Sequence, residues 1–168
     1  MTETPRVTVY TPSRYYGRFL DQAIGSVASQ SYTDWELLII DDGSVDDTGE
    51  IASQWAAAES RIRVLKHETP RGLPACANAA LSCARGQYIM RLDADDYLDA
   101  NALLVLVTYL DQHPDIALVY PNYVHIDEHN HYLGVEHRKR IGAEVQLLDL
   151  PAHGACTMVR RNILEQVG

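Results

Sequence analysis

Short runs of β-branched and apolar residues alternate along the chain with longer segments in which apolar residues recur every three or four positions. The first pattern is typical of β-strands, and the second is typical of amphipathic helices. Their alternation predicts βαβ units around a mostly parallel sheet, which is an α/β fold. The predicted strands are 7–10, 36–40, 61–66, 87–92 and 116–120, and the predicted helices are 18–30, a segment from Ser44 to Ala56, 73–85 and 103–110.

Single residues indicate where some of these elements begin or end. Ser44 is a candidate cap for the second helix, with Asp47 three residues later in the place of a capping-box acid. Gly86 can end the third helix by adopting a left-handed conformation, and Pro114 closes the fourth. Beyond the fifth strand the alternation weakens, and residues 124–133 indicate a hairpin.

The composition narrows the class of protein. A chain of 168 residues, with 46% hydrophobic and 22% charged residues, is typical of one globular domain with one core. The net charge of -9 argues against nucleic acid as a partner, because that binding needs clustered Lys and Arg. A ligand that carries phosphate would then need help from a cation.

Two further properties bear on location. No apolar run approaches the roughly 18 residues that a membrane span needs, and the first residues lack the features of a signal peptide. We therefore expect a cytoplasmic protein without a transmembrane segment. The three cysteines are expected to be small buried thiols.

Two acidic clusters directly follow predicted strands. Asp41-Asp42 comes after the apolar run 36–40, and Asp93-Ala94-Asp95-Asp96 comes after the strand 87–92. In an open parallel sheet the ligand crevice lies at the carboxyl ends of the strands, where Thr11-Pro12-Ser13-Arg14 also follows the first strand.

Carboxylates gathered in such a crevice repel one another and repel phosphate, unless a hard cation such as Mn²⁺ or Mg²⁺ lies among them. The sequence therefore predicts a metal-assisted site for a nucleotide diphosphate. The alternative is that Asp41, Asp42 and Asp96 are helix caps or turn formers.

The segments 34–44 and 86–96, which contain Asp-Asp-Gly-Ser and Asp-Ala-Asp-Asp, resemble the two signatures of family 2 inverting glycosyltransferases. The resemblance covers nearly the whole chain and implies the GT-A fold, a Rossmann-like, mostly parallel sheet flanked by helices. It implies one domain over 1–168. Within it, 1–114 would form the nucleotide-sugar-binding half, and 115–168 the beginning of an acceptor-side half that continues in a longer protein.

The resemblance also implies roles for individual residues. Asp42 would contact the nucleotide base, Asp93 would approach the ribose, and Asp95 would hold the metal on the diphosphate of a nucleotide sugar, with a uridine diphosphate sugar expected. The further donor-binding candidates are Thr11, Pro12, Ser13, Arg14, Arg71 and Ala94.

The chain departs from the family pattern in two places. Ser13-Arg14-Tyr15 follows Pro12 where the family usually has Thr-Tyr-Asn, so Arg14 either stacks on the base or is a surface residue. Arg71 lies close to where some relatives have a phosphate- or base-contacting Arg, although Gly72 fits the common Gly there. The general base of the family belongs to a motif that normally follows the end of this segment, so we expect the base beyond Gly168.

Other functions stay open at this point. A nucleotidyltransferase would want a Gly-rich basic loop after the first strand, and a phospho-acceptor domain would want an acidic pair there. Neither is present in 11–16. A donor-binding module that is inactive without downstream residues is a further alternative, and the acceptor, a glycan or a lipid-linked glycan, is not specified.

Two clusters outside the acidic strand ends admit a functional and a structural interpretation. His125, His129 and His131 have a spacing that could suit zinc, but a solvated hairpin is favoured. Arg138-Lys139-Arg140 could meet phosphate or an anionic membrane surface in a peripheral association, and a solvated loop is favoured.

Overall fold

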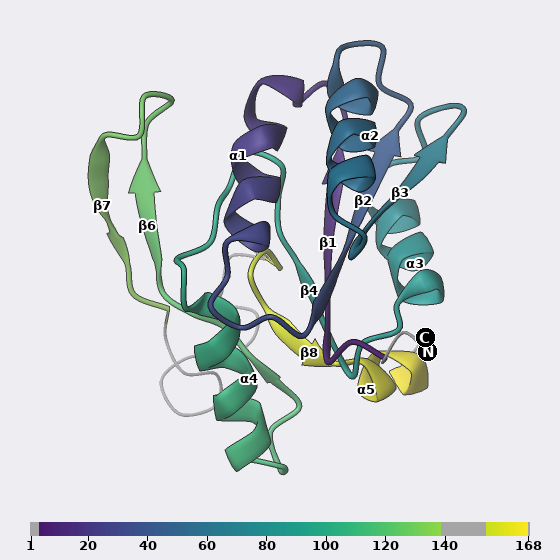
Figure 1. Ribbon diagram of the computed structural model, residues 1–168. Coiled ribbons are helices and arrows are strands. Elements are labelled where there is room, and N and C mark those ends of the chain that lie inside the picture. Colours follow the sequence, from purple (N-terminus) through teal and green to yellow (C-terminus); the bar gives the residue numbers. More distant parts are fainter. Residues whose placement is uncertain (1–3, 139–153, 168) are drawn as a thin grey trace.

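The computed structural model describes residues 4–138 and 154–167. The chain forms a six-stranded sheet in the order β3-β2-β1-β4-β8-β5 and a separate hairpin of β6 and β7 (Figure 1). The sheet strands are β1 (Val7–Ser13), β2 (Trp35–Asp42), β3 (Ile62–His67), β4 (Tyr88–Arg91), β5 (Leu118–Val119) and β8 (Met158–Arg160). The remaining elements are α1 (Gly17–Ala28), α2 (Thr48–Ala58), α3 (Leu73–Cys83), α4 (Ala102–Gln112), β6 (Tyr123–Ile126), β7 (Tyr132–Glu136) and α5 (Arg161–Val167).

The strand order places a switch point beside β1. The strands β1, β2, β3 and β4 are parallel, and β1 pairs with β2 on one side and with β4 on the other. The chain therefore winds from β1 out to β3 and then returns across the sheet to β4. In sheets of this kind a ligand binds outside the carboxyl ends of the two strands at the switch point.

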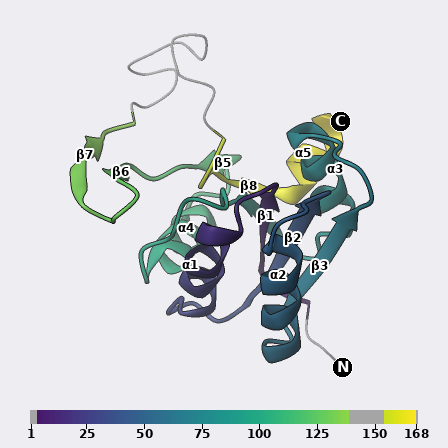
Figure 2. The ribbon, with the colours of Figure 1, turned by 90° about the horizontal axis from the view of Figure 1, so that it is seen from above.

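Helices cover both faces of the sheet, as the view in Figure 2 shows for α2 and α3. Alternate residues of β2 explain this arrangement, since successive side chains of a strand point to opposite faces. Leu37 and Ile39 belong to the larger core cluster with α1, α2 and α4, whereas Leu38 and Ile40 pack with α3. All four are completely buried, so β2 is a central strand, as its unbroken apolar run predicts.

A buried carboxylate ties β4 to the strands beside it. Glu36 of β2 is 1% exposed, accepts hydrogen bonds from the Thr8 hydroxyl at 2.8 Å and the Arg85 amide at 2.7 Å, and forms ion pairs with Arg63 and Arg85. The Gly86 amide donates to the same Thr8 hydroxyl at 2.9 Å. These bonds fix the point at which the chain enters β4.

Two of the boundary residues act differently from the sequence prediction. The helix α2 begins at Thr48, and Ser44 does not cap it; the Ser44 amide instead donates to Asp41 Oδ1 at 2.9 Å. Gly86 does not adopt a left-handed conformation, and α3 ends in extended backbone at Ala84. Gly86 is needed because a Cβ there would lie 2.5 Å from the Thr8 amide nitrogen.

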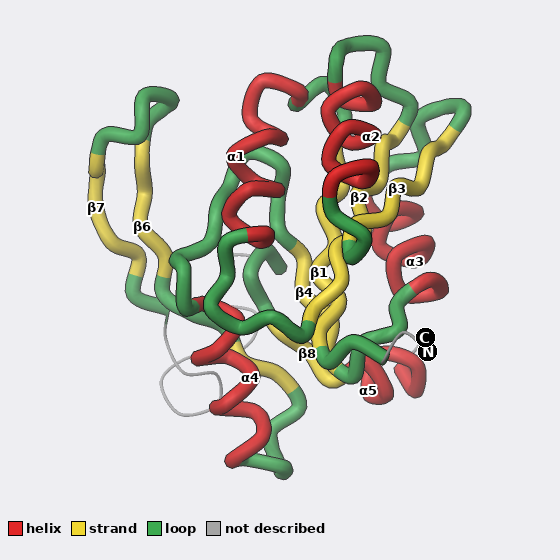
Figure 3. The backbone as a smooth tube through the Cα atoms, in the orientation of Figure 1, coloured by secondary structure: helices red, strands yellow, loops and turns green. Residues whose placement is uncertain are grey.

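The second half of the chain is less regular. The predicted hairpin is present as β6 and β7, which stand apart from the main sheet in Figure 3. Only Leu118–Val119 of the predicted strand 116–120 joins the sheet, and it pairs antiparallel with β8. No helix among the described residues is long and apolar enough to cross a membrane.

Candidate functional site

A cavity of about 470 Å³ opens at the carboxyl ends of β1, β2 and β4, on the switch-point edge of the sheet. Its walls come from three loops and the beginning of α3. The lining residues are Pro12, Ser13, Arg14, Tyr16, Asp42, Gly72, Leu73, Cys76, Asp93, Ala94 and Asp95. This set includes every site residue that the sequence predicted, except Thr11 and Arg71.

The end of β1 presents polar groups to this cavity. Ser13 is 3% exposed, and its hydroxyl has no hydrogen-bond partner among the described residues. Arg14 is exposed, with its guanidinium carbon 5.2 Å from the centre of the Tyr15 ring. Tyr15 has a φ of 63°, and its amide donates to the Ser44 hydroxyl at 3.2 Å. The chain thus turns sharply after β1 and leaves a buried hydroxyl without a partner at the cavity.

Asp42 is held by three donors. Its carboxylate accepts hydrogen bonds from the amides of Arg71 and Gly72, each at 2.8 Å, and contacts His67 Nδ1 at 2.6 Å. Burial acts to raise the pKa of Asp42, but the hydrogen bonds from His67, Arg71 and Gly72 outweigh it and lower the pKa to about 2. Asp42 is therefore a fixed, ionised acceptor at neutral pH.

The loop that supplies two of these donors depends on glycine. Gly72 has a φ of 82°, a left-handed conformation that other residues adopt only with strain. It precedes α3, and its carbonyl accepts the Cys76 amide at 3.1 Å. The turn at Gly72 thereby directs two amides at Asp42 and starts the helix that carries Cys76.

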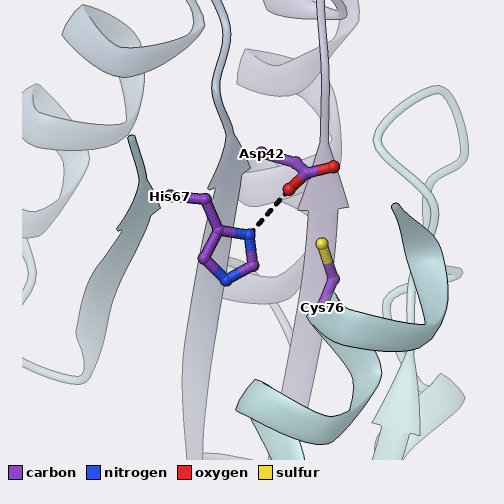
Figure 4. Close-up of side chains that lie close together, drawn as sticks. All are labelled: Asp42, His67 and Cys76. Atoms are coloured by element: carbon purple, nitrogen blue, oxygen red, sulfur yellow. Dashed lines mark hydrogen bonds and ion pairs between the residues drawn. The ribbon is translucent and has the colours of Figure 1, made fainter. Parts of the chain in front are cut away.

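His67 and Cys76 lie beside Asp42, although no sequence motif marks either of them. Figure 4 shows the Cys76 sulfur and the His67 ring beside the Asp42 carboxylate. Burial, and after it the charge of Asp42, raises the pKa of the Cys76 thiol to about 11. Among the described residues this is the one group of three or more His, Cys, Asp or Glu whose ligand atoms gather closely, within 4.8 Å. The hairpin histidines form no such group.

Of the three carboxylates in the acidic turn after β4, Asp93 is paired with an arginine and Asp95 is exposed at the cavity. Asp93 is bound by Arg91, with Nε at 2.8 Å from Oδ1 and Nη2 at 3.1 Å from Oδ2. Asp95 is exposed and lines the cavity, with no hydrogen bond or ion pair to any residue in 4–138 or 154–167. Mn²⁺ and Mg²⁺ take oxygen ligands, commonly one or two carboxylates with substrate phosphates, so this donor set fits such an ion.

The other predicted residues have structural positions. Asp41 accepts the Ser44 amide and is 1% exposed, as a turn former would be. The Asp96 amide donates to the Asp93 carbonyl at 3.1 Å and closes the acidic turn. Thr11 is buried at 1% exposure and does not line the cavity. Arg71 contributes its amide to Asp42, while its side chain is not part of the lining.

A segment from the end of the chain supports the acidic turn. The Cys156 amide donates to the Arg91 carbonyl at 2.7 Å, and Ala155 forms a parallel bridge with Arg91. Burial, followed by the charges of Asp96 and Asp93, raises the pKa of the Cys156 thiol to about 12. Of the basic run at 138–140, Arg138 lies over the Tyr120 ring at 4.3 Å, and Lys139 and Arg140 are outside the described residues.

Comparison with known proteins gives a consistent set of similarities. Residues 8–168 match the family described as Glycosyl transferase family 2. The chain is 32% identical over 122 residues to the glycosyltransferase GlyG of Streptococcus pneumoniae. This match covers 73% of this chain and 40% of that protein. It is 31% identical over 127 residues to the chondroitin synthase of Escherichia coli, covering 76% of this chain and 18% of that protein.

Solved structures share the fold. TarS 1-349 of S. aureus superposes with a TM-score of 0.73 at 21% identity, covering 96% of this chain and 49% of that one. The mannosyltransferase PcManGT of Pyrobaculum calidifontis superposes with a TM-score of 0.75 at 22% identity, covering 99% and 48%. Both are GT-A transferases, which confirms the predicted fold class. The chain spans less than half the length of each of these relatives.

Proposed function

This chain belongs to glycosyl transferase family 2, and we propose that it is the part of a glycosyltransferase that binds a nucleotide-diphosphate sugar in the cavity at the strand ends. The observation that carries the proposal is the position of that cavity. It lies at the switch point of the sheet and brings Asp42, Asp93 and Asp95 together with the end of β1. Sheets of this type bind nucleotides at that place.

Asp42 is proposed to recognise the base. An ionised carboxylate only accepts hydrogen bonds, so it suits the ring N–H of uracil or guanine, whereas adenine and cytosine offer only an exocyclic amino group as a donor on that edge. The solved relatives agree with this chemistry, because TarS was crystallised with UDP and with UDP-GlcNAc, and PcManGT with GDP-Man. We propose a uridine diphosphate sugar as the donor.

The acidic turn is proposed to hold the ribose and the diphosphate. Asp93, kept in place by Arg91, would accept from a ribose hydroxyl, and Asp95 would hold Mn²⁺ or Mg²⁺. When bound, such a cation neutralises charge on the departing diphosphate. The unpartnered hydroxyl of Ser13 and the guanidinium of Arg14 are further groups for the donor. The mannosyltransferase PcManGT, solved with Mn²⁺, supports a divalent cation.

Transfer is proposed to proceed with inversion to a glycan or lipid-linked glycan. The chondroitin synthase among the relatives supports a glycan as the acceptor. In this proposal residues 1–114 form the donor half, residues 115–168 begin the acceptor side, and the general base lies beyond Gly168. The isolated chain would then bind the donor without completing transfer. We propose a cytoplasmic site for the reaction.

Thermal unfolding with a panel of nucleotides tests the donor site. UDP and UDP sugars should raise the melting temperature in the presence of Mn²⁺, because a ligand that binds only the native state stabilises it. At a hundredfold excess over Kd the gain is about 2.7 kcal/mol, or roughly 5 to 10 °C for a domain of this size. ADP and CDP should give no shift.

Substitutions at Asp42 and Asp95 test the proposed base contact and the proposed metal ligand separately. Asp95→Asn should abolish the effect of Mn²⁺ on UDP binding, whereas Asp42→Asn should weaken UDP with and without Mn²⁺. Asp115→Asn, an exposed carboxylate after α4 and outside the cavity, is the matched control and should behave as the wild type. A metal-dependent UDP shift that survives in Asp95→Asn would overturn the assignment of Asp95.

A further inference from the structure

Three potential ligands for a metal gather beside the cavity, which Asp42 and Cys76 line, and none of them belongs to the acidic turn. Asp42 ends β2, His67 ends β3, and Cys76 lies in the second turn of α3. One ligand atom from each residue lies within 4.8 Å of the other two, and Figure 4 shows the three side chains converging. The side chains of Asp42 and His67 are 6% and 10% exposed, and Cys76 as a whole residue is 1% exposed, so all three are shielded from bulk water.

We propose that Asp42, His67 and Cys76 form a binding site for a thiophilic divalent cation of the zinc class, and that the ion occupies the place of the nucleotide base. The second part rests on the proposed function, because it takes Asp42 as the group that contacts the base. The first part depends only on the three side chains.

The set of ligands favours zinc over the ion proposed for Asp95. Zinc binds thiolate sulfur, imidazole nitrogen and carboxylate oxygen, whereas Mn²⁺ and Mg²⁺ favour oxygen. Bond lengths of about 2.0 to 2.3 Å place the ligand atoms of tetrahedral zinc roughly 3 to 4 Å apart. The contact of 2.6 Å between His67 Nδ1 and Asp42 Oδ1 would open slightly, and the sulfur would move inward.

The backbone already holds the three residues in place. Asp42 and His67 are register partners in the parallel pair of β2 and β3, which fixes them side by side. The amides of Arg71 and Gly72 hold the carboxylate, and the Cys76 amide bonds to the Gly72 carbonyl at 3.1 Å. Outer bonds of this kind orient the ligands of a metal site and raise its affinity.

Binding of zinc would release one proton from the site and leave one coordination position of the ion open. The Cys76 thiol loses its proton to solvent, since the thiolate is the form that binds metal. His67 would bind through Nδ1, so the proton that Nδ1 shares with Asp42 would move to Nε2 of the same ring, and Asp42 is already ionised. Three protein ligands leave the fourth coordination position of zinc for a water molecule from the cavity, as in zinc sites that have three protein ligands and an exchangeable water.

The two metal sites would have opposite consequences for the donor. An ion at Asp95 would assist binding of the diphosphate, whereas an ion on Asp42 would consume the acceptor that the base needs. Zinc would therefore compete with UDP, and Mn²⁺ would not.

Direct measurement of zinc binding tests the site without any nucleotide. The metal-free chain is mixed with Zn²⁺ in competition with a coloured chelator, and one ion per chain is expected. Cys76→Ser and His67→Gln should each weaken Zn²⁺ by roughly 100-fold or more, since each removes a direct ligand, and loss of an outer partner alone costs 10- to 100-fold. Co²⁺ in place of Zn²⁺ should give a thiolate charge-transfer band that is absent in Cys76→Ser.

Two matched variants serve as controls. Cys83→Ser changes a thiol of the same helix outside the group, and His131→Gln changes a histidine of the hairpin. Both should bind Zn²⁺ as the wild type does. Equal Zn²⁺ affinity in Cys76→Ser and the wild type, or loss of binding in His131→Gln, would overturn the site.

A second measurement tests the competition. The Kd for UDP is determined with Mn²⁺ present, at increasing Zn²⁺, and should rise in proportion to Zn²⁺ in the wild type but stay constant in Cys76→Ser. Tight zinc binding with no effect on UDP would overturn the competition and leave the zinc site intact. Absence of UDP binding without any zinc would instead contradict the proposed function.

Discussion

The carboxylate of Asp42 contributes to the stability of the domain against acid. Its pKa is about 2 in the folded chain, against an ordinary value of 3.8. A lowered pKa stabilises the folded state above the unfolded value, and this stabilisation is lost as the pH falls from about 4 to about 2. The contribution is about 2 kcal/mol, at about 1.4 kcal/mol for each unit of pKa.

Urea unfolding of the wild type and of Asp42→Asn between pH 2 and pH 6 would measure this contribution. The difference in unfolding free energy between the two should shrink by about 2 kcal/mol as the pH falls through this window. A difference that stays constant with pH would show that the three donors around Asp42 do not select its ionised form.

Sequence patterns located the acidic residues of the site but not their neighbours. Asp42, Asp93 and Asp95 could be placed because they follow strands directly, and the ends of parallel strands meet at one edge. His67 and Cys76 could not, because no local motif marks them. His67 is 25 residues from Asp42 and reaches it only through the register of β2 and β3.

At the scale of elements, Gly86 is where α3 gives way to β4, and its missing side chain is essential. A Cβ there would lie 2.5 Å from the Thr8 amide nitrogen and 2.7 Å from the Val7 carbonyl carbon, both of them backbone atoms that cannot rotate away. Gly86→Ala should therefore destabilise the domain by about 3 kcal/mol, the upper part of the range for overpacking.

Gly134→Ala in β7 is the matched control, since its Cβ would meet nothing within 4 Å. Its unfolding free energy should stay close to that of the wild type. Denaturant unfolding of both variants gives the comparison, and equal stabilities would show that β1 can shift to accept a side chain at residue 86.

The central elements could be predicted, whereas of the two short strands β5 and β8 only β5 fell within a predicted strand, 116–120, and β8 was not predicted. The strand β2 could be recognised from its apolar run at 36–40, and α1 and α4 from apolar residues that recur at helical spacing. The strands β5 and β8 have two and three residues and pair antiparallel, so their sequences carry no period long enough to recognise. The pairing of β8 with β4, and of β5 with β8, is what defines them.

For the whole molecule, the strand β8 joins the end of the chain to its middle. It lies between β4 and β5, and Arg160 donates to the Leu110 carbonyl at 2.7 Å and the His113 carbonyl at 3.1 Å at the end of α4. Deleting residues 154–168 would expose the edge of β4 and remove these bonds. The melting temperature should fall by about 10 °C, and soluble aggregates should form at the open edge.

Calorimetry and size-exclusion chromatography would check this deletion. Arg160→Gln keeps β8 but removes its hydrogen bonds to the end of α4. Its melting temperature should therefore lie between those of the deleted chain and the wild type, and it should remain a monomer. If the deleted chain had the same melting temperature as the full chain, β8 would contribute nothing to the stability of the fold.

The order of the strands was the part of the fold that periodicity alone left open. Alternating elements predict a parallel sheet, but they do not say that β1 lies between β2 and β4. The resemblance to a known family implied a Rossmann-like, mostly parallel sheet, and the six-stranded sheet confirms that class. The order of its strands comes from the structure alone.

Because β1 lies between β2 and β4, its two edges become paired at different times during translation. On the ribosome β1 emerges first and finds β2 soon afterwards, but its other neighbour begins only at Tyr88. Throughout translation of α2, β3 and α3 the nascent chain therefore holds one finished strand with an unpaired edge, the state in which growing chains most readily associate. The cavity cannot exist before that edge closes, so the domain acquires its ligand site in one late step.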